Sequence, residues 1–493
     1  MKVTKDQPHT TYTFRALLAL FFVLFFLKCT VLFYLAYLAK CGSNPTSGLF
    51  FQIAGDTKGY LGAVENYIRT GKYFVSNGLA DVYAARMPYY GSIYYLLRLV
   101  FPMNIAYELL VILQIGVDAL SVIFLGLIAN LLFKTRFSFW LTIFLSTVSL
   151  NVTYWSLSLL PESFSVSFLI FFIYYYLRYK HTQSCVHLLL SGFWLAFLIV
   201  LKPYFFPLIG LIGIDLLTKG FSSITLDWGR AITHTVILSA ILFFFLSPWI
   251  IRNYLVLDKF IPLQESIYAE YVYTESDLAC RRFIQAWGGN AGVYWEKKSA
   301  ACYFMLHPTT PCEFVFPDYV STPGYTMKEI ETVKDKYIQL QLHYNDSLDV
   351  KVTNEFNRLT SIYVKEKPFR YYLLSPLIIA KNFIFHSGSY YMPISSSFKC
   401  YHAYQLPIKL SQTLLYYFTL FFGFAGLLLM FLANRSTLFI FAVPIYIIVF
   451  ICFYLKAGEF RYFIHSYPVF ILGTVYSCEM IKKRLSLNKA LKQ

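Results

Sequence analysis

The sequence predicts an all-α polytopic membrane protein with about ten transmembrane helices and an extracytoplasmic loop domain, mixed or helical in structure. The 493 residues are 57% hydrophobic and only 14% charged, whereas soluble domains carry about a quarter charged residues. Several apolar stretches, such as Leu17–Leu38 and Ala231–Ile251, reach the ~20 residues that cross a ~30 Å hydrocarbon core. Segments that cross lipid must be helices, because a helix satisfies its own backbone polar groups.

The chain opens with a span that we expect to be retained. Residues 1–39 hold an N-terminal tail and the first apolar stretch, Leu17–Leu38. This stretch is too long for the apolar region of a signal peptide, and no small-residue cleavage site follows it. Residues 40–104 are then expected to form a first loop on the outer face, and residues 105–251 a transmembrane bundle.

The charged residues set the expected topology. Spans are predicted near residues 16–38, 105–133, 137–159, 162–178, 187–201, 203–218, 231–251, 410–433, 437–455 and 462–481. Lys and Arg gather in the connections that this order places inside, as the positive-inside rule requires. The net charge of +16 therefore indicates topology and contact with anionic lipid, not nucleic acid.

The weakest part of this topology is residues 187–218. Two short apolar runs flank Lys202-Pro203 there, and they also fit one helix that is kinked at the proline. The hairpin is favoured, because losing one crossing would place the Lys/Arg-rich C-terminus outside.

A second, much longer outer loop follows at residues 252–409. Long loops without structure are uncommon, so we expect this one to be folded. Polar stretches near 326–345 and 347–366 have a helical pattern, and the Tyr-rich, half-apolar stretch 368–386 suits a helix at the membrane surface. Residues 410–481 complete the spans, and residues 482–493 form a basic cytoplasmic tail.

Three cysteines of the long loop, Cys280, Cys302 and Cys312, lie outside in this topology, where a disulfide is possible. The turn-rich segment Phe304–Pro311 would let Cys302 and Cys312 meet. The choice of partner stays open.

Candidate site residues follow the first span. Asp56 precedes a helical run that contains Tyr60 and Glu65, and Arg86-Met-Pro88 leads into an aromatic stretch. The simplest role for Asp56 is an N-cap, which Asp suits. A second interpretation is catalytic, because a carboxylate can act as a base and nearby cations can stabilise negative charge that develops in a reaction.

Further charged residues occur at predicted outer helix edges. They lie in Leu159-Leu-Pro-Glu162-Ser163, Leu201-Lys202-Pro203, Ser247-Pro-Trp-Ile-Ile-Arg252-Asn-Tyr254 and Glu459-Phe-Arg461-Tyr462, the last followed by Tyr467-Pro468. The three cations equally fit interfacial anchors that snorkel from helix ends. Glu162 has almost no loop to reside in, and an ionisable group at membrane depth is a functional hypothesis, unless it is simply exposed at the bilayer surface.

Taken in order, these five segments resemble the outer loops of the glycosyltransferase C superfamily, specifically the protein O-mannosyltransferase and lipid A aminoarabinose transferase group. The resemblance implies an inverting membrane glycosyltransferase with a polyprenyl-phosphate sugar donor and a lipid, glycan or protein acceptor. Two departures limit the transfer. Asp56 is followed by Thr57 where many O-mannosyltransferases have Asp-Glu, and Arg86-Met-Pro88 replaces a Lys before Pro-Pro, so the acceptor cannot be carried over.

The resulting hypothesis gives each residue a role. Asp56 and Glu162 are expected to be catalytic. The expected partners of the donor phosphate are Arg86, Lys202, Arg252 and Arg461, and those that orient the acceptor or sugar are Tyr60, Glu65 and Glu459. A divalent metal fits if the two catalytic carboxylates converge. Asp118, deep in the second span, is expected to be structural.

Two rival functions use related lipids. A transporter or flippase of lipid-linked sugars is disfavoured, because no internal repeat is visible and residues 252–409 form a long outer segment that a carrier does not need. A polymerase or ligase of undecaprenyl-pyrophosphate glycans would use outer Arg residues but would not predict Asp56 as a base. We expect a bacterial inner membrane location with the active site on the periplasmic face.

Overall fold

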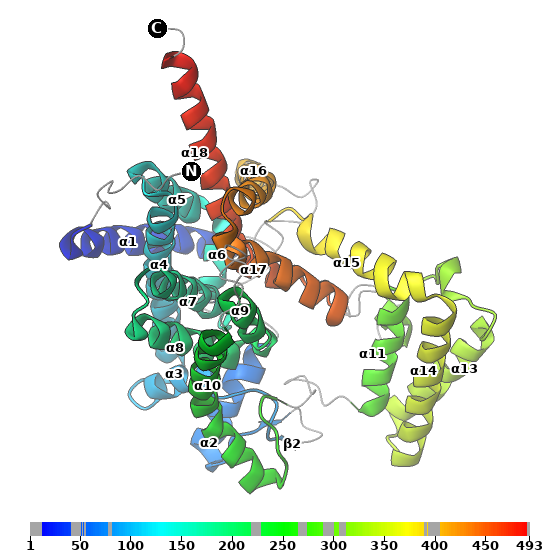
Figure 1. Ribbon diagram of the computed structural model, residues 1–493. Helices are drawn as coiled ribbons and strands as arrows, with labels where there is room; N and C mark the ends of the chain where they lie inside the picture. The colour runs from blue at the N-terminus through cyan, green and yellow to red at the C-terminus, as the bar shows by residue number, and fades with distance from the viewer. Residues whose placement is uncertain are drawn as a thin grey trace. The chain divides into compact units, whose positions relative to one another are not determined.

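The protein is helical almost throughout the part of the chain that the structure describes. The computed structural model describes residues 12–40, 51, 53, 56–76, 81–217, 228–264, 274–288, 300–304, 312–388, 392 and 405–490 (Figure 1). Within these ranges the only sheet is a two-stranded antiparallel ribbon, β1 (Val75–Ser76) with β2 (Asp81–Val82). The predicted class, an all-α polytopic membrane protein, is confirmed.

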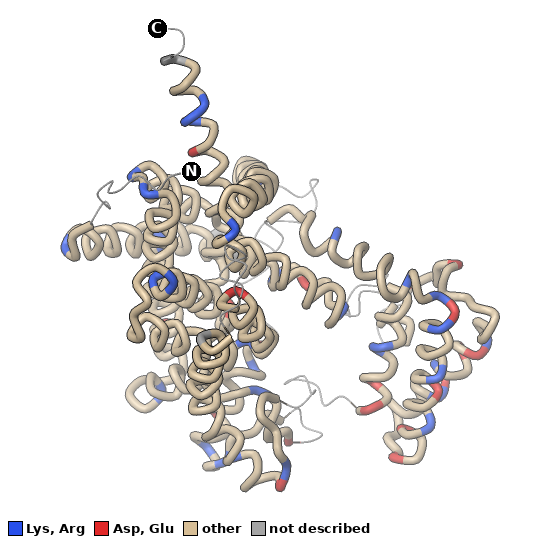
Figure 2. Tube along the Cα trace, viewed as in Figure 1, with Lys and Arg blue, Asp and Glu red and all other residues tan. Residues whose placement is uncertain are grey.

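Two compact units make up the chain. The first comprises Met1–Glu270, Ser387–Pro444 and Ile464–Gln493, and the second comprises Tyr271–His386 and Ile445–Phe463. Charged residues are sparse along the helices of the first unit and dense along the helices of the second (Figure 2). This contrast is the one expected between a body in lipid and a body in water.

Long apolar helices run through the first unit, and the last of them continues into the second unit from Ile445. Five segments of the described chain have the length and composition to cross a membrane: Phe14–Tyr37, Met103–Phe133, Ala231–Leu257, Gln405–Ala433 and Arg435–Tyr454. They belong to α1 (Phe14–Lys40), α4 (Met103–Phe133), α10 (Trp228–Leu257), α16 (Gln405–Ala433) and α17 (Leu438–Val449, extended by η9, Phe450–Tyr454). A sixth candidate is α5 (Arg136–Val148) with the segment Leu150–Leu157, bent by 56° between them.

Helices also occupy the remaining predicted spans. These are α7 (Glu162–Thr182), α8 (Cys185–Leu201), α9 (Leu208–Leu217) and α18 (Tyr467–Ala490). Of these, α8 and α9 are shorter than a full crossing, so they need neighbouring helices to complete their burial.

Two ion pairs show that α8 and α9 form a hairpin. Lys202, just after α8, lies 2.7 Å from Glu162 at the start of α7. Asp215 of α9 lies 2.8 Å from Lys180 near the other end of α7. The two ends are about 27 Å apart at 1.5 Å per helical residue, so the chain reaches one end of α7 with α8 and returns with α9. A single kinked helix cannot make both contacts.

Buried polar contacts tie the other helices together. Lys28 of α1 lies 2.6 Å from Asp118 of α4 and 2.6 Å from the Thr153 hydroxyl, with both charged groups buried. This contact supports the structural role expected for Asp118. Elsewhere α16 packs on α18 through glycines, where a Cβ at Gly426 would overlap the Gly473 carbonyl oxygen, so the backbones approach as they do at small-residue membrane interfaces.

Most of the second unit is a bundle of amphipathic helices, and the end of α17 with η9 also belongs to it. Its elements are α11 (Glu275–Trp287), α12 (Ala300–Phe304), α13 (Met327–Leu342), α14 (Asp346–Glu366), η6 (Arg370–Leu374) and α15 (Ser375–Ile384). Capping boxes at Thr274 and Thr326 start α11 and α13, and Phe283, Phe304 and Phe356 are buried in the core. The helices predicted in this loop are confirmed.

The three outer cysteines lie in this unit. Cys280 is buried in the core. Cys302 lies beside Cys312: burial, together with a hydrogen bond between the two thiols, raises the pKa of Cys302 to about 11. Of the pairings left open by the sequence, the structure brings Cys302 and Cys312 together.

Candidate functional site

The first loop is built around a short helical hairpin in the first unit. After Asp56, η1 (Lys58–Gly62) leads into α2 (Ala63–Thr70), which ends at Gly71 with a φ of +73°, the left-handed conformation that glycine adopts easily. The chain returns through the β1–β2 ribbon to α3 (Tyr89–Arg98). A Cβ at Gly91 would lie 2.7 Å from Val64 Cγ2, so α3 packs directly on α2.

This loop is docked on the start of α7. The Thr57 hydroxyl donates to the Leu159 carbonyl oxygen at 3.2 Å. Asp56 precedes Thr57 and is partly exposed, and its carbonyl accepts from the Gly59 N–H at 3.0 Å. Asp56 is adjacent to Thr57, and Leu159 lies three residues before Glu162, so this contact joins the segment of Asp56 to the segment of Glu162.

Glu162 and Lys202 form the centre of the site. The Lys202 Nζ lies 2.7 Å from Glu162 Oε1, and the two residues are 5% and 1% exposed. Two charges are buried at this depth only when they are paired. The structure therefore joins two of the residues that the sequence singled out, 40 positions apart.

A buried tyrosine ring connects this pair to the first loop. The Arg86 guanidinium carbon lies 4.6 Å from the Tyr60 ring centroid, and the Lys202 Nζ lies 6.0 Å from the same centroid. Cations are attracted to the faces of aromatic rings at these distances. Tyr60, Arg86, Lys202 and Glu162 thus form one cluster, which we call the Tyr60 cluster.

Hydrogen bonds through Tyr90 and Gln114 hold the residues that pack against the Tyr60 cluster. Tyr90 contacts Tyr60 edge to face at 5.7 Å, and its hydroxyl donates to Gln114 Oε1 at 2.8 Å. The Gln114 amide in turn donates to the carbonyl oxygens of Ser156 and Ser158, both at 2.9 Å. Sequence reasoning missed Tyr90 and Gln114, although a glutamine inside an apolar span is a signal of this kind.

Arg252, which the sequence places at the donor phosphate, contacts the backbone of the first loop in this structure. Its guanidinium donates to the carbonyl oxygens of Tyr73 and Tyr83 and to Asn253 Oδ1. The Tyr73 hydroxyl donates to the Arg86 carbonyl oxygen at 3.3 Å. Arg252 therefore fastens the first loop to the end of α10, and the fork that was expected to bind phosphate is used on backbone carbonyls.

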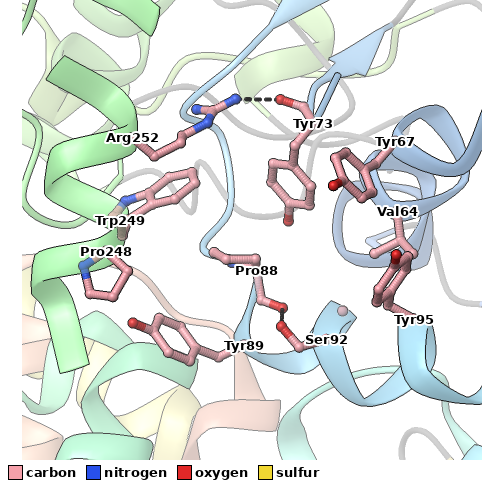
Figure 3. Close-up of a pocket in the computed structure, with 11 residues that line it drawn as sticks. Val64, Tyr67, Tyr73, Pro88, Tyr89, Ser92, Tyr95, Pro248, Trp249 and Arg252 are labelled. Atoms are coloured by element: carbon pink, nitrogen blue, oxygen red, sulfur yellow. Dashed lines mark hydrogen bonds between the residues drawn. The ribbon is translucent and has the colours of Figure 1, made fainter. Parts of the chain in front are cut away.

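An aromatic pocket lies beside this contact. Its volume is about 400 Å³, within the roughly 300–1,000 Å³ of ligand pockets. The lining residues are Val64, Tyr67, Tyr73, Pro88, Tyr89, Gly91, Ser92, Tyr95, Pro248, Trp249 and Arg252. Figure 3 shows the aromatic rings around the cavity, with Arg252 at its edge and hydrogen-bonded to the Tyr73 carbonyl.

The lining of this pocket is uncharged except for Arg252. Burial raises the pKa of the Tyr73 phenol well above its usual range, against the opposing charges of Arg252 and Arg86. The phenol is therefore protonated at physiological pH. A neutral aromatic wall of this kind suits an apolar chain or the face of a sugar ring.

The hydrogen-bond partners of Glu65 are residues outside the Tyr60 cluster. Its carboxylate accepts from Arg98 at 2.7 Å and from the Tyr94 hydroxyl at 2.6 Å. Burial opposes ionisation, but these two hydrogen bonds and the Arg98 charge outweigh it and hold the pKa of Glu65 below its usual range. The residue ties α2 to α3, which is a structural use of a side chain expected to orient the acceptor.

Glu459 and Arg461 belong to the second unit. They pair with each other, with Arg461 Nε 2.5 Å from Glu459 Oε1. Glu459 lies just before η10 (Phe460–His465), and Arg461 lies within it. The first unit resumes at Ile464, near the end of η10.

His465 is a buried polar residue that the sequence analysis did not select. Its Nε2 lies 2.7 Å from the Ser165 hydroxyl, and its Nδ1 lies 3.1 Å from the Tyr204 hydroxyl. The Ser165 proton is directed to the Glu162 carbonyl oxygen at 2.9 Å, so Ser165 accepts from Nε2–H and Tyr204 donates to Nδ1. Neutral histidine satisfies both contacts and braces the chain on either side of the Glu162–Lys202 pair.

The side chains present fit a divalent cation poorly. Among the residues that the structure describes, no three His, Cys, Asp or Glu side chains gather as a metal site would require. Glu162 is already bonded to the Lys202 ammonium, which competes with a cation for the carboxylate. We therefore derive no step through a metal.

Comparisons with known proteins give a likeness in fold. No family model matches the chain, and no curated protein matches it in sequence. The archaeal oligosaccharyltransferase AglB from Archaeoglobus fulgidus, in complex with an inhibitory peptide and a dolichol-phosphate, aligns at a TM-score of 0.53 with 12% identity, covering 97% of this chain and 51% of that one.

Two further structures of the Archaeoglobus fulgidus enzyme align similarly. The apo form gives a TM-score of 0.52 at 11% identity, over 97% of this chain and 52% of that chain. The form tethered with an acceptor peptide containing the NVT sequon gives 0.50 at 12% identity, over 94% and 50%. This chain thus shares the fold of these solved structures and spans about half their length.

Proposed function

We propose that this chain is an integral-membrane inverting glycosyltransferase that moves a sugar from a polyprenyl-phosphate donor to a lipid, glycan or protein acceptor. The observation that carries the proposal is the Tyr60 cluster: two cations on one buried ring, beside an aromatic pocket, at the edge of the membrane helices. The fold supports this proposal, because the solved structures that it resembles are oligosaccharyltransferases, one of them in complex with a dolichol-phosphate.

The donor phosphate is assigned to Arg86 and Lys202. Both cations contact the Tyr60 ring, and cations placed where negative charge develops stabilise a departing phosphate. The lipid chain is assigned to the aromatic pocket, because Pro88 and Tyr89, which follow Arg86 closely in sequence, line it. Arg252 contributes by holding this part of the loop in place.

Asp56 is assigned as the base. In the proposed step the acceptor oxygen or nitrogen attacks the sugar anomeric carbon while its proton passes to the Asp56 carboxylate. The bond from that carbon to the phosphate oxygen breaks, and the phosphate leaves with the bonding electrons toward Arg86 and Lys202. A single displacement of this kind inverts the anomeric centre. Glu162, paired with Lys202 at 2.7 Å, holds that cation in position.

The assignment of Asp56 is tested by Asp56→Asn, with Asp81→Asn as the matched control. Asp81 is an exposed residue of β2 in the same loop, so its neutralisation makes the same change in net charge. Asn retains most capping ability but cannot accept the proton, so Asp56→Asn should slow transfer about 10²–10⁴-fold while Asp81→Asn leaves it unchanged.

The measurement starts from a deletion strain. Mass spectrometry of its envelope lipids, glycans and proteins identifies the species that loses one sugar, and transfer to that species is then followed with purified protein in detergent. Thermal stability and donor-lipid binding are checked in parallel. Turnover of Asp56→Asn within about threefold of the parent would leave Asp56 as a helix cap. Transfer that requires sealed vesicles would favour a carrier.

A further inference from the structure

One surface of the second unit is apolar where the neighbouring helix surfaces are polar. It lies on the continuous helical stretch 368–384, which comprises η6 and α15. The exposed large side chains are Phe369, Tyr372, Leu373, Leu377 and Ile378, with Phe385 just beyond the helix. Phe369 is 68% exposed and Leu377 is 48% exposed, values that a soluble helix rarely shows at several adjacent positions.

The opposite face of the same helix is also apolar. Ser375, Pro376, Ile379, Ala380 and Phe383 are buried within the unit. A helix that is apolar around its circumference is typical of a protein core or of lipid, not of a water-exposed surface. The π-helical turn of η6 shifts the phase of the helix, so that the exposed positions recur as the pairs 372–373 and 377–378 on one side.

The neighbouring helix α14 shows what a surface in water looks like in this unit. Its exposed positions include Lys351, Asn354, Arg358, Ser361 and Lys365. Its buried positions, such as Phe356 and Leu359, face the core. The two helices follow each other in sequence, and only the second exposes an apolar face.

The packing partner of α15 shows which candidate membrane span it lies beside. It packs against η9 (Phe450–Tyr454), and η9 forms the last residues of the candidate membrane span Arg435–Tyr454. Two residues beyond that span, the Lys456 ammonium donates to the Tyr371 carbonyl oxygen at 2.9 Å. The stretch 368–384 therefore lies beside the end of a candidate membrane span.

The charges near this stretch agree with a headgroup region. Burial among protein atoms lowers the pKa of Lys456 to about 8. Lys381 is exposed on the same helix as the apolar face, and Arg370 lies within η6. Cations and aromatic rings on an apolar helix are the composition of elements that lie in the membrane interface.

We propose that residues 368–384 form an interfacial helix whose exposed apolar face rests in the acyl chains of the bilayer, anchoring the second unit to the membrane at the end of α17. The inference goes beyond the proposed transfer reaction and does not depend on it. The anchor also contacts the segment that carries Glu459 and Arg461, since Phe383 lies 5.5 Å from Phe463 and His386 lies 5.3 Å from Phe460. The lipid surface thereby sets the depth of that segment.

The test places a photoreactive benzoylphenylalanine at single positions of the full chain. The test positions are Leu373 and Leu377, the control in the same unit is Ser361 of α14, and the control for lipid contact is Phe421, 58% exposed in the span of α16. Each variant is reconstituted in liposomes of radiolabelled phosphatidylethanolamine and phosphatidylglycerol and irradiated.

Labelled lipid should attach at positions 373, 377 and 421, with at least tenfold less at 361. Absence of lipid attachment at both 373 and 377, with attachment at 421 intact, would overturn the proposal. Attachment of 377 to a second copy of the chain in place of lipid would overturn it equally, because the face would then be a protein interface. Using two test positions guards against local misfolding at either one.

Discussion

The two ends of α7 hold similar ion pairs in different surroundings. At its start, Glu162 pairs with Lys202, and Arg86 approaches the same Tyr60 ring as Lys202. Near its other end, Asp215 pairs with Lys180, and the remaining partners are the Tyr176 hydroxyl at 2.6 Å and, for Lys180, the Ser436 carbonyl oxygen at 3.0 Å. Both carboxylates are almost fully buried.

The burial and pairing of a carboxylate therefore do not by themselves distinguish a functional ion pair from a structural one in this protein. The two pairs differ in the residues that surround them. The Glu162–Lys202 pair adjoins a second cation on the shared ring and, through the first loop, an aromatic pocket. The contacts of the Asp215–Lys180 pair join α7 to α9 and to Ser436 before α17, and the Lys180 side chain is 21% accessible. We therefore assign chemistry to the first pair and packing to the second.

The largest effect expected from this comparison comes from breaking the first pair. Lys202→Met leaves the Glu162 carboxylate buried without its ammonium, which should destabilise the protein by about 3–5 kcal/mol. Adding Glu162→Leu should recover most of that stability, since replacing both partners of a buried pair with apolar residues is often neutral. Turnover should stay low in the double variant, because the cation is gone.

The matched control is the other end of α7. Asp215→Leu combined with Lys180→Met should keep both stability and turnover near the parent values. Thermal unfolding in detergent and sugar transfer are the two measurements. Full turnover in the Glu162→Leu, Lys202→Met variant would make the two ends equivalent and remove the site from the Tyr60 cluster.

A smaller effect is expected from Arg86, the cation that distinguishes the two ends. Arg86→Ala removes a charge-assisted contact worth about 1.5–3 kcal/mol, so donor use should fall roughly 10–100-fold. Arg86→Lys should recover part of it, because Lys keeps the charge and loses the bidentate fork. Steady-state kinetics with varied donor lipid measures this. An unchanged rate for Arg86→Ala would exclude the residue from phosphate binding.

Arg252 tests whether a cation in the region of the Tyr60 cluster has a structural role or takes part in the reaction. Its guanidinium bonds to the carbonyl oxygens of Tyr73 and Tyr83, so Arg252→Lys should lose part of the fork and destabilise the protein by roughly 1–3 kcal/mol. Hydrogen exchange should increase at residues 73–83 accordingly. If the Arg252→Lys variant kept the stability and turnover of the parent, the charge alone would matter. That result would support the role at the donor phosphate that the sequence suggested for Arg252.

The smallest effect is expected at Glu65. The pair with Arg98 is partly exposed, with side chains 29% and 18% accessible, so Glu65→Gln should change stability by less than about 1 kcal/mol and leave turnover unaffected. The pKa of Glu65 is below its ordinary 4.5. Its contribution to stability is therefore present above pH 4.5 and is lost as the pH falls below that value toward the folded pKa. Thermal unfolding across this range, parent against variant, measures it. A large loss of turnover in the variant would restore its predicted role with the acceptor.

The helices could be predicted from the sequence because their signals are local. Apolar runs marked the membrane helices, and the helical pattern of the polar stretches near 326–345 and 347–366 marked α13 and α14. The residues of the Tyr60 cluster were also candidates from the sequence: Glu162 and Lys202 because they adjoin apolar spans, and Tyr60 and Arg86 because the first loop resembles that of a known family. Charge asymmetry selected the hairpin at residues 187–218, which the ion pairs at both ends of α7 then showed.

The partners of these residues could not be predicted, because they lie far apart in the chain. Nothing near Asp118 in sequence indicates Lys28, and nothing near Ser165 indicates His465. Arg252 illustrates the same limit. Its signature suggested phosphate, but which oxygen atoms its fork reaches depends on how the first loop folds back, and there they are backbone carbonyls.

The order of the buried ion pairs along the chain has a consequence for biosynthesis. In each pair one member is made well before the other: Lys28 precedes Asp118 by 90 residues, Glu162 precedes Lys202 by 40, and Lys180 precedes Asp215 by 35. At about 5–20 residues per second, these intervals last roughly 2–18 s. During that time α1 and α7 each carry an uncompensated charge, so the insertion machinery must hold them in a polar environment until α4, α8 and α9 emerge.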